Sequence, residues 1–143
     1  MSRRSDSMDR AAEIAGERVK DQARALGECQ QALGEAEAKL AELERFRGDY
    51  ATSAGAGDVR QLLNRRQFVH KIEEAIAYQR AVIMRLRRAL EEQRTQWRDA
   101  RARAKALDGV SGRLRAGEAR TAERLEQAQL DERARQTRPW SED

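Results

Sequence analysis

Few side chains in this sequence could take part in catalysis, and their spacing does not favour it. His70 is the single histidine and Cys29 the single cysteine. A zinc site needs several such ligands, and a nucleophilic triad needs a nucleophile, a base and an orienting acid held together by a fold. Residues 55–57, Gly-Ala-Gly, lack the third glycine and the lysine of a phosphate-binding loop. We therefore expect no catalytic residue, no metal ligand, no cofactor and no enzymatic activity.

The same side chains have simpler interpretations as parts of helices. His70 fits an exposed position of a helix, while Cys29 and Trp97 fall on apolar positions of a helical repeat, where packing explains them. Trp140 follows Pro139 in a polar tail and is either a contact residue or solvated.

The composition is typical of a long helical coiled coil. Charged residues make up 38% of the 143 residues, and Phe, Tyr and Trp occur only twice each. Ala, Arg, Glu, Leu and Gln dominate, as they do in coiled coils. Disorder is the alternative, because mean hydropathy is low. The regular apolar period and the single proline argue against it.

Charge and targeting signals indicate a cytoplasmic protein that does not bind nucleic acid. No apolar run approaches the ~20 residues that span a membrane, and the N-terminus lacks the apolar core of a signal peptide. The 29 basic and 25 acidic residues are interleaved, which indicates solvated helix faces. Nucleic-acid binding is the weaker alternative, and steep salt dependence would be its sign.

A turn between Tyr50 and Asp58 divides the chain. Gly55 and Gly57 permit positive φ, and Asp58 can cap a following helix. The predicted fold is all-α, a two-helix antiparallel coiled-coil hairpin with unequal arms. We expect helix one at about residues 9–52, the turn at 53–58 and helix two at 59–136. Residues 1–8 and 137–143 are expected to be disordered.

Apolar residues at heptad spacing predict the faces on which these helices pack. Helix one offers Ala12, Val19, Leu26, Leu33 and Leu40, with companions three residues later at Ala15, Gln22, Cys29, Ala36 and Leu43, and one heptad further at Tyr50. Helix two offers Leu62, Val69, Ile76, Ile83, Leu90, Trp97 and Ala104, with Ile72, Gln79, Leu86, Gln93, Ala100, Leu107 and Leu114 as companions. We call these two faces the seam.

Unequal arms leave the last thirty or so residues of helix two without a partner in the chain. Because a lone helix poor in apolar residues is marginal in water, this part is expected either to fray or to be held by another molecule. Near the turn, Leu43, Phe46 and Tyr50 form one stripe, and Phe68, Ile72 and Ala75 form another. These stripes are either the best-packed end of the hairpin or a partner site.

In its order and spacing of motifs the sequence resembles the flagellar export protein FliJ family and its type III secretion relative YscO. The matching pieces are Leu40-Ala-Glu-Leu-Glu-Arg-Phe-Arg-Gly-Asp-Tyr50, Asn64-Arg-Arg-Gln-Phe68, Ile72-Glu-Glu-Ala-Ile76 with Gln79, Trp97, and Glu123-Arg-Leu-Glu-Gln-Ala-Gln-Leu-Asp-Glu132. Three residues depart from the family pattern: Phe46 stands where the family often has Tyr, Gln79 where some members have His, and Lys39 where some members have Gln.

The resemblance implies a stalk that couples an export ATPase hexamer to the cytoplasmic domain of an export gate and helps to recycle export chaperones. It implies a gate contact at Leu43, Phe46, Tyr50, Phe68, Ile72, Ala75 and Gln79. It implies an ATPase contact at Glu123, Arg124, Gln127, Asp131 and Glu132. Membrane association would be at most peripheral, at the inner-membrane export apparatus. The alternatives are a YscO-like secretion stalk and a self-associating coiled-coil scaffold.

Overall fold

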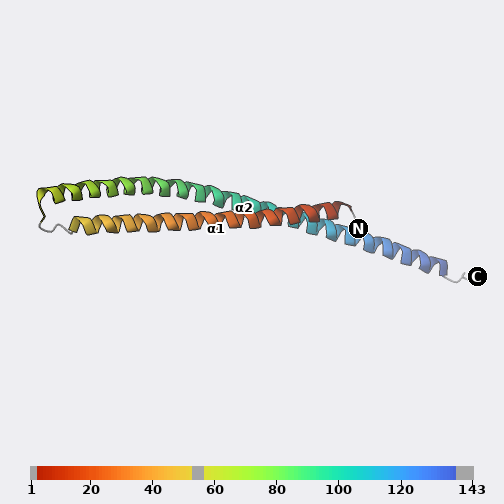
Figure 1. Ribbon diagram of the computed structural model, residues 1–143. Coiled ribbons are helices and arrows are strands. Elements are labelled where there is room, and N and C mark those ends of the chain that lie inside the picture. Colours follow the sequence, from red (N-terminus) through yellow and green to blue (C-terminus); the bar gives the residue numbers. More distant parts are fainter. Residues whose placement is uncertain (1–2, 53–56, 138–143) are drawn as a thin grey trace, which may run out of the picture. The chain divides into compact units, whose positions relative to one another are not determined.

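The protein folds as an antiparallel pair of helices, as the seam predicts. The computed structural model describes residues 3–52 and 57–137, which form α1 (Arg3–Thr52) and α2 (Val59–Thr137) (Figure 1). The described residues contain no strand, and the two helices pack against each other. The expected disorder after residue 137, Trp140 within it, and residues 53–56 of the expected turn lie outside the described residues.

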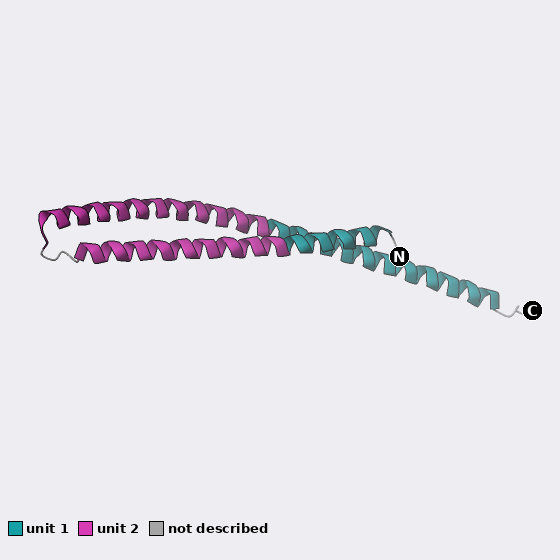
Figure 2. Ribbon diagram, viewed as in Figure 1, with its two compact units in different colours: residues 1–19, 99–143 teal, residues 20–98 magenta. Residues whose placement is uncertain are grey.

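The chain divides into two compact units, one of residues 20–98 and the other of residues 1–19 and 99–143 (Figure 2). In the first, called the hairpin unit here, parts of α1 and α2 run side by side, and the predicted seam forms its core. The best buried seam side chains are those of Ala36, Ile72, Ile76, Gln79, Ile83 and Leu90. Their spacing of three and four residues places them on one face of each helix, so burial follows directly from the heptad pattern.

Two glutamines lie inside this apolar seam and fix how the helices align. The Gln79 side chain, only 5% exposed, donates a hydrogen bond of 3.0 Å from Nε2 to the backbone carbonyl of Ala36. Farther from the turn, the Gln93 amide donates to the side chain of Gln22. A buried amide that loses its partner costs about 1–3 kcal/mol, so these pairs disfavour any shifted register.

Ion pairs beside the seam join the two helices in the same antiparallel alignment. Arg80 contacts Glu44 at 3.3 Å, and Arg87 contacts Glu37 at 3.8 Å. All four side chains are well exposed, so each pair contributes at most about 1 kcal/mol. The pairs therefore favour this alignment without being its main source of stability.

Asp58 caps α2 as expected. Its Oδ1 accepts a hydrogen bond of 2.8 Å from the backbone N–H of Gln61, and its carbonyl accepts the first helical bond, from Leu62. Gly57 does not have the positive φ that its residue type permits. A side chain at this position would instead meet the side chain of Gln61, which accounts for the absence of one.

The second unit, called the terminal unit here, pairs the start of α1 with the later part of α2. α1 begins at Arg3, six residues before the expected start at Asp9, and Ser5 and Ala15 are buried. Asp9 accepts hydrogen bonds from the Ser111 hydroxyl and the Arg115 guanidinium of α2. The burial of Ser5 shows that packing also reaches the first turns of α1, before Asp9.

Within the terminal unit, α2 continues past the end of this pairing (Figure 2). Every residue from Ala119 to Thr137 is exposed, although the segment is helical throughout. We call residues 119–137 the tail. It is shorter than the expected thirty or so residues because α1 reaches back to Arg3 and covers α2 as far as Glu118.

Candidate partner-binding surfaces

Three exposed aromatic rings distinguish the hairpin unit next to the turn. Phe46 and Tyr50 on α1 and Phe68 on α2 are 38–47% exposed, whereas the seam side chains farther along are buried. The rings of Tyr50 and Phe68 stack with centroids 4.6 Å apart and planes inclined by 42°. Such a pair contributes about 0.5–1.5 kcal/mol beyond its buried area. It holds both rings in place while leaving much of their surface open to a partner.

The structure divides the residues predicted for the gate contact into two groups. Phe46, Tyr50 and Phe68 are exposed, and Leu43 and Ala75 are half-buried beside them. Ile72 and Gln79 lie inside the seam, and the Gln79 amide is occupied by Ala36. The two buried residues can support this surface from below, but a partner would reach only the other five.

Three further apolar residues near the turn were not foreseen as surface residues. Val59, Leu62 and Leu63, in the first turn and a half of α2, are all more than half exposed. Leu62 was expected in the seam. The apolar spacing of three and four residues at 59, 62 and 63 was a visible signal, but it could not distinguish a packed face from an open one.

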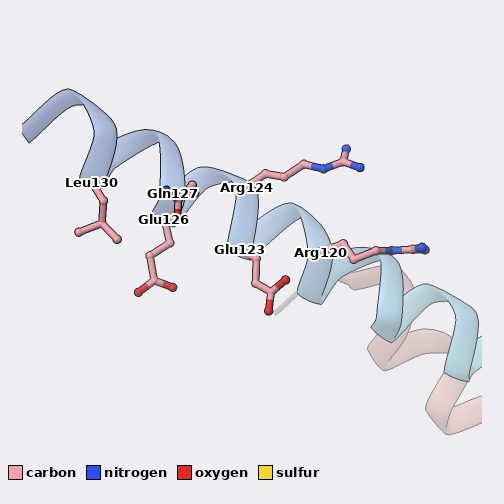
Figure 3. Close-up of a pocket in the computed structure, with 6 residues that line it drawn as sticks. All are labelled: Arg120, Glu123, Arg124, Glu126, Gln127 and Leu130. Atoms are coloured by element: carbon pink, nitrogen blue, oxygen red, sulfur yellow. The ribbon is translucent and has the colours of Figure 1, made fainter. Parts of the chain in front are cut away.

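The residues predicted for the ATPase contact all lie on the exposed tail. Glu123, Arg124, Gln127, Asp131 and Glu132 are exposed, and the Gln127 amide donates to Asp131 at 3.2 Å. Figure 3 shows Arg120 and Arg124 projecting away from the side that carries Glu123, Glu126 and Leu130. These side chains come from one helix, so they line an open surface with opposite charges on different sides.

The part of the chain that the structure describes contains no cluster of three or more residues that could hold a metal ion. His70 is exposed, and its Nε2 lies 3.0 Å from the Glu74 carboxylate one helical turn away. Cys29 is half-buried in the seam. Both residues have ordinary helical surroundings, in agreement with their sequence-based interpretation.

Asp9 is the most perturbed carboxyl among the described residues. The hydrogen bond from Ser111, and then that from Arg115, lower the pKa of Asp9 below its ordinary value. Reciprocally, the Asp9 carboxylate raises the pKa of Arg115. The cluster joins the two helices of the terminal unit and lines an open recess of about 330 Å³, to which Glu13 and Asp108 also contribute.

The two helices pack against each other as in the predicted antiparallel hairpin. A family model described as flagellar FliJ protein matches residues 5–138, nearly the whole chain. The chain belongs to the flagellar FliJ family. A comparison with curated protein sequences found no match.

Membership of the FliJ family makes the chain a component of the flagellar protein export apparatus. The family is one of structural export components. Neither described helix has a stretch apolar enough to cross a bilayer.

Proposed function

We propose that the chain is a non-enzymatic, cytoplasmic stalk that links the export ATPase hexamer to the cytoplasmic domain of the export gate and assists the recycling of export chaperones. The exposed tail carries most weight in this proposal. A water-exposed helix without packed neighbours is marginally stable by itself, so an ATPase ring that encloses it would stabilise it. The tail residues Glu123, Arg124, Gln127, Asp131 and Glu132 then contact the ring.

The aromatic surface near the turn is proposed to contact the gate. Five residues form it, namely Leu43, Phe46, Tyr50, Phe68 and Ala75, with Ile72 and Gln79 as buried supports. Exposed aromatic rings held by stacking are favourable anchors, since aromatic residues dominate the binding energy of many interfaces. The chain would associate with the inner membrane only peripherally, through the gate.

Substitution of both phenylalanines tests the gate contact. Phe46→Ala with Phe68→Ala should weaken binding of the gate domain by tenfold or more, because the loss of each aromatic anchor costs about 1–2 kcal/mol of binding free energy. Binding of the ATPase should stay unchanged. Isothermal titration calorimetry with each purified partner measures both effects.

The control for this experiment is Met84→Ala, which removes an exposed apolar side chain of α2 farther from the turn. It should leave gate binding unchanged. A large loss of helical circular dichroism in the double variant would mean that the two rings stabilise the hairpin itself. Absence of binding to both purified partners by the unaltered chain would refute the stalk proposal.

A further inference from the structure

The hairpin unit contains a groove near the turn that shares only Tyr50 with the proposed gate contact. It has a volume of about 490 Å³ and lies between the end of α1 and the start of α2. Four of the lining residues are aliphatic or aromatic, and the other four are arginine, histidine or glutamate. The lining residues are Tyr50, Ala51, Leu62, Arg65, Arg66, Val69, His70 and Glu73.

Most of this groove lies on a different flank of α2 from the exposed ring of Phe68, although Arg65, about one helical turn before Phe68, lies beside that ring's position on the helix. Arg66 and Phe68 are two residues apart, which is a rotation of about 200° around a helix. Only Tyr50 belongs to both surfaces, since its ring stacks on Phe68 and also lines the groove. A partner could therefore occupy the groove while another covers Phe46 and Phe68.

The excess positive charge of the chain is concentrated around this groove. Residues 45–71 contain six basic and two acidic residues, and the remaining residues contain 23 of each. The formal charge of +4 therefore belongs to this segment. Arg60, Arg66 and Lys71 are exposed, and Arg65 is half-buried at the edge of the groove.

We propose that the groove binds an acidic amphipathic segment of a partner protein. A large apolar side chain of that segment enters the recess between Leu62 and Val69, and a carboxylate of the segment pairs with Arg66. Arginine suits this role because its planar fork can bind a carboxylate through two hydrogen bonds. The groove recognises a segment whose carboxylates lie one helical turn from its apolar anchor residue.

The chemistry of the groove fits an acidic protein segment better than an anionic membrane. Glu73 lies at the edge, and the Glu74 carboxylate contacts His70 on the same flank. These carboxylates repel a uniformly negative surface but can lie between the separate charges of a peptide. The recess also has room for a single apolar side chain, which a protein segment can supply. The site shares only Tyr50 with the gate contact proposed above.

The test uses the full chain labelled with ¹⁵N and a short synthetic helical peptide in which leucines and a phenylalanine alternate with glutamates at helical spacing. Two matched peptides replace either the glutamates by lysines or the large apolar residues by serines. In NMR titrations the acidic apolar peptide should shift the amide signals of Ala51, Leu62, Val69 and His70. Both matched peptides should bind at least about fivefold more weakly.

Charge reversal at the edge of the groove provides the decisive comparison. Arg66→Glu should weaken binding of the acidic peptide by about three- to tenfold, because an attraction between exposed charges becomes a repulsion. Arg88→Glu makes the same change at an exposed site farther along α2 and should have less than a twofold effect. Binding should also weaken as salt is added.

Equal binding by the Arg66→Glu and Arg88→Glu variants would overturn the proposal, as would the absence of shifts in the groove at millimolar peptide. Vesicles of anionic phosphatidylglycerol that bind the chain and displace the peptide would replace the proposal by a membrane contact. Gate-domain binding by the same Arg66→Glu variant is measured in parallel. Its retention shows that the two surfaces act separately, so failure of the peptide to bind leaves the gate contact in place.

Discussion

At the scale of single residues, polar side chains within the packed faces decide how the two helices meet. In the hairpin unit, the Gln79 side chain donates a hydrogen bond to the Ala36 carbonyl, and the Gln93 side chain donates one to Gln22. In the terminal unit, the Asp9 carboxylate accepts hydrogen bonds from Ser111 and Arg115. Apolar seam residues alone tolerate slippage by a heptad, because one layer of leucine or alanine resembles the next. Each of these polar pairs forms only in one alignment, so the pairs favour this register.

Replacement of Asp9 by asparagine should make this effect visible through pH. The pKa of Asp9 is lowered in the folded chain, so its charged form stabilises folding above its ordinary pKa of about 3.9. That stabilisation is lost as pH falls through the lowered pKa of the folded state. At pH 7 the variant should therefore melt a few degrees below the unaltered chain, and well below pH 3 this difference should disappear.

Thermal melts followed by circular dichroism at both pH values measure the effect. Asp21→Asn, an exposed aspartate on the same helix, is the matched control and should not alter the melting temperature at either pH. An Asp9→Asn effect of equal size at both pH values would show that the charge of Asp9 does not contribute to stability.

At the scale of elements, α2 combines a well-packed part and a fully exposed part in one continuous helix. It is helical throughout, but most of the stability of a helix in a protein comes from the packing of one of its faces. Ile76, Ile83 and Leu90 supply that packing within the hairpin unit, whereas no residue of the tail is buried. Local stability should therefore differ greatly along α2.

Hydrogen exchange should detect this difference and its reversal by a partner. In the free chain, amides of residues 119–137 should exchange much faster than those around Ile76 and Ile83. Addition of the export ATPase should slow exchange in the tail by tenfold or more, because enclosed amides open less often. Residues 72–90 serve as an internal control and should remain slow in both states.

Strong protection of the tail in the free chain would contradict this expectation. It would show that the tail already packs against another copy of the chain. Slow exchange without added ATPase would therefore favour the self-associating scaffold over the stalk.

At the scale of the whole molecule, the core apolar side chains of the seam are buried by packing within a single chain. The large apolar side chains Ile76, Ile83 and Leu90 are buried by intrachain packing, so they are not available to a second copy. A parallel scaffold dimer would have to separate the hairpin and expose these residues before forming new contacts. That exposure costs about 1.5–3 kcal/mol for each fully buried side chain.

We therefore expect a monomer at tens of micromolar. Sedimentation equilibrium should give a mass close to 16.3 kDa over this range. The Phe46→Ala, Phe68→Ala variant should give the same mass, because those rings are not expected to join two copies. A mass near twice this value, or one that falls in the double variant, would support self-association.

Local sequence patterns were sufficient for the helices, the seam, the cap at Asp58 and the exposed helical setting of His70. These follow from side-chain periodicity and short-range hydrogen bonds, which a sequence displays directly. The extension of α1 to Arg3 was not predictable in this way, because the partners of Asp9 are Ser111 and Arg115, about a hundred residues away.

The sequence by itself determined which face of each helix is apolar, because helical period fixes the direction of every side chain. Only the tertiary structure decided which of those apolar residues are covered, because coverage depends on whether a partner helix is present at that level. Ile72 and Leu62 show the difference, since both fit the same heptad pattern but only Ile72 is buried. The exposed surface near the turn and the groove beside it exist for that reason.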